Sequence, residues 1–132
     1  MLNLLSMEIS DKDFETLINQ SMDELPQQYI KGLKNVLITF EDLPTPEQLH
    51  KQRLGPHQTL FGLYEGIPLT KRGSNYNLVL PDKITLFKQP LSASSHDLPS
   101  LKSQVKHTLW HEIAHYYGLE HDRIHEIERN WR

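Results

Sequence analysis

The stretch HEIAHYYGLEH, residues 111–121, holds three histidines, two glutamates and one glycine, and it lies at the end of a segment with helical periodicity. The apolar residues on one face of that segment are Leu98, Leu101, Val105, Leu109 and Ile113. Asp97 or a preceding serine can cap the segment, and Pro99 suits the first turn of a helix. Gly118 suits the end of a helix, since glycine adopts a left-handed conformation without steric cost. The sequence therefore predicts a helix over residues 98–117.

The histidines of this stretch have the spacing of metal ligands. His111 and His115 lie one turn apart on a helix, so their imidazole nitrogens can reach one ion at about 2.0–2.1 Å. Glu112 projects about 100° away from His111, which suits a general base better than a ligand. A turn at Gly118 could bring His121 back as a third ligand. Three protein ligands leave one position for water, which is the arrangement of a catalytic rather than a structural zinc site.

Such a site predicts a zinc-dependent metallopeptidase. Zinc lowers the pKa of a water molecule that it holds toward about 7 and polarises a carbonyl group. Glu112 would take the proton from that water and return it to the leaving amine. We expect one zinc per chain and a peptide or protein substrate, although manganese, iron and nickel accept the same ligands. Two alternatives remain: a surface helix whose imidazoles face solvent, and a non-catalytic metal-binding regulatory or interaction protein.

Other polar residues are candidates for supporting roles. A hydrolase of this kind needs a group that stabilises the developing oxyanion. Tyr64, Arg72 and Tyr76 are the candidates for this role or for substrate contacts. His107 precedes His111 by four residues and shares its helix face. We interpret it as a partly exposed helix residue, with a contact near the metal or the substrate as the alternative.

Composition narrows the choice of site and partner. The chain has 132 residues, a formal net charge of −3 and no cysteine. Any metal site must therefore use histidine, aspartate or glutamate. The weak negative charge argues against nucleic acid, because a surface that binds phosphates needs a basic excess. The N-terminus is a poor signal peptide, and no apolar stretch approaches the length of a membrane span, so we expect a cytoplasmic protein without a membrane partner.

The remaining segments predict the fold class. Besides the helix over 98–117, the expected helices are residues 10–24, capped by Ser10, a helical turn at 26–33 and a last helix at 122–130, and the expected strands are 35–40, 59–66 and 83–90. Prolines in EDLPTPEQL, residues 41–49, predict a loop. This order predicts a single α+β domain over residues 1–132, with a small mixed sheet of three to four strands packed against helices.

The motif HExxHxxGxxH resembles that of the zincin metallopeptidases. The sequence resembles more closely the minimal zincin-like metallopeptidases, a family of small, mostly bacterial proteins. The stretches that carry it are NVLITFED (35–42), LFGLYEGIPLTKR (60–72), LPDKITLFKQP (80–90) and VKHTLWHEIAHYYGLEHDRI (105–124). The resemblance covers about residues 10–128.

This resemblance implies a zincin-like fold in which the edge strand of the sheet lies beside the metal helix. In zincins the substrate commonly pairs with that strand as an extra β-strand. We expect residues 83–90 to form it, because they directly precede the metal helix. Family members often have an aspartate three residues after the glycine. His121 occupies that position here and Asp122 follows it, so Asp122 is the alternative third ligand.

Overall fold

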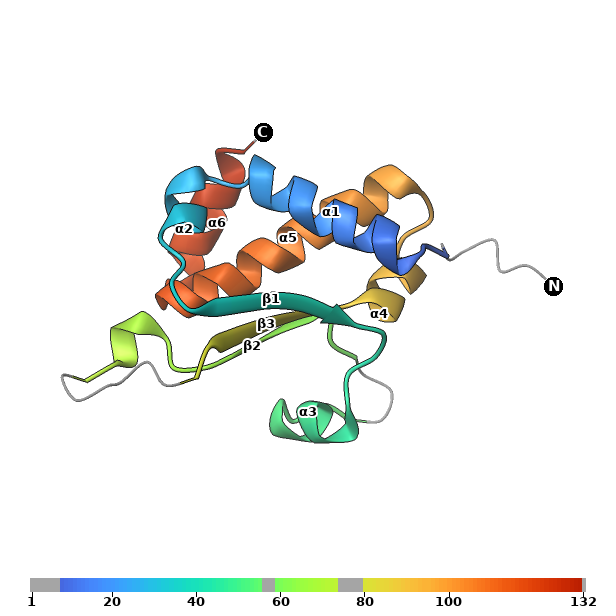
Figure 1. Ribbon diagram of the computed structural model, residues 1–132. Helices are drawn as coiled ribbons and strands as arrows, with labels where there is room; N and C mark the ends of the chain where they lie inside the picture. Colours follow the sequence, from blue (N-terminus) through green and yellow to red (C-terminus); the bar gives the residue numbers. More distant parts are fainter. Residues whose placement is uncertain (1–7, 56–58, 74–79, 132) are drawn as a thin grey trace.

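The computed structural model describes residues 8–55, 59–73 and 80–131 of the chain (Figure 1). The elements are, in order, α1 (Asp11–Glu24), α2 (Gln27–Lys31), β1 (Val36–Glu41), α3 (Pro46–Lys51), β2 (Gly62–Glu65), the 3-10 turn η1 (Leu69–Lys71), β3 (Asp82–Phe87), α4 (Lys88–Ala93), α5 (Leu98–Tyr117) and α6 (His121–Arg129). The predicted α+β class, with one small mixed sheet, is confirmed. None of the helices in the described part has both the length and the apolar character that crossing a membrane requires.

Strand β3 occupies the centre of the sheet, between β1 and β2. β1 runs parallel to it, with Ile38 opposite Ile84, and β2 runs antiparallel, with Tyr64 opposite Ile84. All residues of β3 except Lys83 are buried, as expected for a strand that is covered on both faces. The prediction that residues 83–90 form the edge strand is therefore wrong. The edge strand that packs against α5 is β2.

Two helices lie where the sequence predicted none. Thr45 begins α3 with a capping box, and Pro46 occupies the first turn, where its missing N–H is not needed. Pro90 likewise lies in the first turn of α4, so the strand predicted over 83–90 ends at Phe87. In both cases the proline suits the start of a helix as well as it suits a loop.

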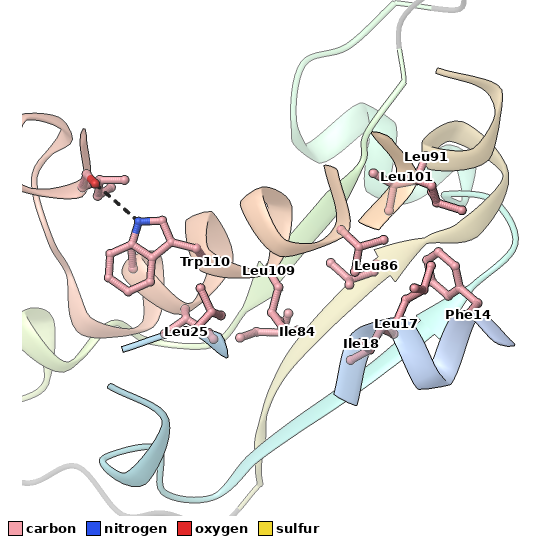
Figure 2. Close-up of a cluster of buried hydrophobic side chains, with 14 of the residues drawn as sticks. Phe14, Leu17, Ile18, Leu25, Ile84, Leu86, Leu91, Leu101, Leu109 and Trp110 are labelled. Carbon is pink, nitrogen blue, oxygen red and sulfur yellow. Dashed lines mark hydrogen bonds between the residues drawn. The ribbon is translucent and has the colours of Figure 1, made fainter. Parts of the chain in front are cut away.

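The core lies between the sheet and helices α1 and α5. In Figure 1 these two helices and α6 lie on one side of the sheet, and α3 lies on the other. α5 packs against α1, β2 and β3. Figure 2 shows Leu109 of α5 directed toward Ile84 of β3, with Trp110 at one end of the cluster. The indole Nε1 of Trp110 donates to the carbonyl oxygen of Ile124 at 3.4 Å, which ties α5 to α6 within the core.

Both ends of α5 are set by the residues that the sequence indicated. Asp97 accepts from the backbone N–H of Ser100 at 2.8 Å and completes a capping box. Gly118 ends the helix in the left-handed conformation, with φ 74°. Only two residues separate Gly118 from the start of α6, so the histidines of α5 and α6 are carried on adjoining helices. The predicted helix over 98–117 is confirmed.

We expect Gly118→Ala to lower the free energy of unfolding by at least about 1 kcal/mol, because a left-handed backbone is costly for a residue with a Cβ. The added Cβ would also lie 2.1 Å from Thr70 Oγ1. Gly73→Ala is the matched control, since a Cβ there meets no described atom within 4 Å. Urea denaturation measures both variants. Equal stability of the two would contradict the tight turn.

Gly62 allows β2 to approach α5 closely, and this contact is testable. A Cβ at Gly62 would lie 2.7 Å from Thr108 Cγ2 and 3.1 Å from Leu86 Cδ2. We expect Gly62→Ala to destabilise the fold by about 1–3 kcal/mol through overpacking. Thr108→Ala removes the nearest obstacle, so urea denaturation of the double variant should recover part of this loss. Strict additivity of the two substitutions would contradict the contact.

Candidate metal centre

Histidines of α5 and α6 face one another along the seam between the two helices. We call this group the histidine seam; its members are His107, His111, His115, His121, His125 and Glu128. The His111 ring is central, with its centroid 5.1 Å from that of His107 and 6.1 Å from that of His115. Across the seam it lies 6.3 Å from the ring of His125, on which His121 stacks at 6.4 Å.

Glu112 lies beside the seam, beneath the edge strand β2. Its residue is 8 % exposed, and its Cγ lies 3.3 Å from the position that a Cβ on Gly62 would take. The carboxylate Oε1 lies 3.1 Å from Nδ1 of His115. This contact leaves Nε2 of His115 and the second carboxylate oxygen available for other partners. A carboxylate next to a predicted metal-ligand histidine and an edge strand is well placed to move a proton on a bound peptide.

The two motif histidines of α5 differ in their electrostatic environment. Burial lowers the pKa of His111 below its ordinary value, and the neighbouring His107 ring adds to this effect. The hydrogen bond with Glu112 raises the pKa of His115. Metal ions bind the neutral imidazole, so burial keeps His111 in the form that coordinates.

The predicted third ligand lies at the start of α6. His121 is the first residue of that helix, Asp122 is the second, and both are exposed. They line a shallow pocket of about 320 Å³ with Leu119 and Glu120. In the described part of the chain, the ligand atoms of His111, His115 and His121 do not all lie within 4.8 Å of one another. The structure thus brings His111 and His115 onto one face, and the assignment of His121 or Asp122 stays a prediction.

Glu128, which the sequence did not indicate as a ligand, completes a different set of ligand atoms. Among the described residues, His107, His111 and Glu128 are the group of three whose ligand atoms all lie within 4.8 Å of one another. Glu128 Oε1 lies 3.5 Å from Nδ1 of His107 and 3.8 Å from Nε2 of His111. A local signal existed: Glu128 follows His125 by three residues and therefore shares its helix face. Imidazole and carboxylate donors suit zinc, so the seam fits a divalent ion.

The predicted oxyanion candidates converge on a buried carboxylate. Tyr64 donates to Asp82 Oδ2 at 2.5 Å, and Arg72 forms an ion pair with the same oxygen. The Arg72 guanidinium also lies over the ring of Tyr116, 5.6 Å from its centroid. Burial raises the pKa of the Tyr64 phenol above its ordinary value. Tyr76, the third candidate, lies outside the described residues.

The comparison with family models agrees with this geometry. A model described as zincin-like metallopeptidase matches residues 33–131, which include β1, the whole sheet, both helices of the seam and the HExxH motif. No curated protein matches the chain. The matched region covers most of the sequence, and it contains the predicted metal helix with its capped start and its glycine end. The chain therefore belongs to the zincin-like metallopeptidase family.

Proposed function

We propose that this chain is a zinc-dependent peptidase that hydrolyses peptide bonds, with Glu112 as general base. His111, His115 and His121 are the proposed ligands of one zinc ion, with Asp122 as the alternative to His121. The observation that carries the proposal is the position of Glu112, which is buried between the metal helix and β2. A metal site with a purely structural role has no need of a carboxylate there.

The chain's own residues supply the proton transfers. Zinc, when bound, would supply a Lewis acid that polarises the scissile carbonyl and makes water more acidic. Glu112 accepts the proton of the attacking water and returns it to the leaving amine. Its contact with His115 Nδ1 holds the carboxylate in one orientation. The low exposure of Glu112 keeps bulk water from competing for that proton.

Strand β2 supports binding of an extended peptide. In the described part of the chain, β2 pairs with β3 on one side and with no strand on its other side. Its free edge offers backbone N–H and C=O groups to a substrate that adds as a further strand. Glu112 lies directly beneath this strand, so a peptide paired with β2 passes close to the general base. Tyr64, Arg72 and Tyr76 remain our candidates for stabilising the oxyanion.

A non-catalytic metal-binding protein on the same scaffold is the second candidate. The observation that favours it is the engagement of Glu112 by His115, which occupies one oxygen of the proposed base. In that case the ion would shape a surface for a protein partner, and no bond would be cleaved. The two candidates differ in whether the metal-loaded chain cleaves peptide bonds, and therefore in whether the carboxylate of Glu112 has a catalytic role.

We expect Glu112→Gln to reduce cleavage of a peptide pool by about 10²–10⁴-fold, because the amide cannot accept the proton. Zinc content should stay the same, since the amide keeps the size of the carboxylate. Cleavage is followed by mass spectrometry and zinc by elemental analysis of the same samples. Glu126→Gln, on the exposed face of α6, is the matched control and should cleave like the unaltered protein. Absence of cleavage by the zinc-loaded unaltered protein would favour the second candidate, and equal cleavage by the Glu112→Gln variant would contradict the role of Glu112 as general base.

We expect one zinc ion per chain after purification without chelators. His111→Ala should abolish this binding, because His111 belongs to every ligand set that the seam offers. His50→Ala, in α3 and away from the seam, should retain the ion. Elemental analysis against protein concentration measures both variants. A metal-free unaltered protein, or full zinc in the His111→Ala variant, would contradict the proposed ligand set.

A further inference from the structure

Glu128 buries a carboxylate oxygen without a hydrogen bond. Its side chain is 16 % exposed, and Oε1 is fully buried with no hydrogen-bond partner in the described part of the chain. His107 and His111 lie near Oε1, at 3.5 and 3.8 Å, and His125 Nδ1 lies 3.7 Å from Oε2. A buried anionic oxygen without a donor is costly, so a native structure retains one where another group satisfies it. Two imidazole nitrogens lie near Oε1 and a third lies near Oε2. A cation is the group that would give both the carboxylate and the imidazoles a partner.

The spacing of the three donor atoms suits a transition-metal ion. Zinc holds nitrogen and oxygen ligands at about 2.0–2.2 Å, so two ligands of a tetrahedral site lie about 3.3–3.5 Å apart. The carboxylate oxygen already lies 3.5 Å from His107 Nδ1 and 3.8 Å from His111 Nε2. All three atoms lie within 4.8 Å of one another. Small side-chain rotations would therefore bring them to coordination distance.

The histidine pair of this group is also better spaced than the pair of the motif. His107 and His111 are one turn apart on α5, as are His111 and His115. Two imidazoles on one tetrahedral ion have ring centroids roughly 5 Å apart, from metal–nitrogen bonds of about 2.0–2.1 Å. The His107 and His111 centroids lie 5.1 Å apart, whereas those of His111 and His115 lie 6.1 Å apart.

An open pocket gives an ion access to this group. Its volume is about 260 Å³, and it is lined by Ser103, Lys106, His107, Glu128 and Trp131. The side chain of His107 is 54 % exposed at the rim. The pocket has room for water or another small ligand in the open coordination position, which three protein donors leave free.

We propose that His107, His111 and Glu128 form a site for a divalent transition-metal ion, separate from the HExxH position. Because one lone pair binds one ion, Nε2 of His111 serves one of the two positions at a time. The two positions therefore compete for a single ion, and an ion held at Glu128 withdraws His111 from the proposed catalytic set. This competition rests on the proposed function, whereas the site itself does not.

Cobalt(II) binding to variants of the full chain tests the site. His115→Ala breaks the motif set and leaves His107, His111 and Glu128 intact. We expect this variant to bind one cobalt ion, with the visible absorption of a tetrahedral site. Adding Glu128→Gln or His107→Ala should weaken that binding at least about 10-fold, since each removes one of three donors. Adding His50→Ala, the control in α3 away from the seam, should not weaken the binding. Circular dichroism verifies that each variant is folded.

Each result decides the proposal without any measurement of cleavage. Absence of cobalt binding to the folded His115→Ala variant would refute the site, as would unchanged affinity after Glu128→Gln. Two cobalt ions on the unaltered protein would refute the competition for His111. A chain that cleaves no peptide but shows the expected cobalt series would refute the proposed function and leave the site standing.

Discussion

Helix α5 must pack into the core and also present polar groups on two different sides. Successive helix residues point about 100° apart, so His111 and Glu112 cannot face the same element. The structure places the two side chains against different elements: His111 faces α6 across the seam, and Glu112 lies beneath β2. Burying a carboxylate under a strand requires the strand to come close, and only a residue without a side chain permits this at Gly62. The register of β2 on β3 is thereby tied to the position of Glu112, the proposed general base.

The parts of the fold that depend on local signals were predictable. The limits of α5 follow from its capping box, its apolar stripe and the glycine at its end, all of which lie within the helix or beside it. The order of the strands is a non-local property. Residues 83–90 were predicted to form the edge strand because they precede α5 in the sequence, and this prediction was wrong. α4 lies between β3 and α5 along the chain, so the strand that precedes the metal helix can sit in the centre of the sheet.

The part of the candidate site that lies on one helix was predictable from the sequence, and the part that depends on contacts between helices was not. His111, Glu112 and His115 belong to one helix, so their spacing fixes their relative directions. Glu128 meets His107 and His111 only because α6 folds back along α5, and that angle depends on core contacts such as the bond from Trp110 to the Ile124 carbonyl. Such contacts join residues of two different helices, so the periodicity within either helix does not predict them. The spacing of His125 and Glu128 places them on one face of α6, but only the packing shows that this face meets α5.

The buried Oε1 of Glu128, which accepts no hydrogen bond from the described residues, suggests a reason for the ionisable groups of the seam. The free energy of unfolding of a domain of this size is about 5–15 kcal/mol. A buried acceptor without a hydrogen bond lowers it by about 1–3 kcal/mol. An apolar residue at position 128 would pack against Trp131 and His107 without this cost. The chain instead places a carboxylate near the imidazoles of His107, His111 and His125, and burial lowers the pKa of His111, which favours its neutral form. An ion at the proposed site would pair with the Glu128 carboxylate and would offset this cost, so the proposal accounts for the retention of the charge.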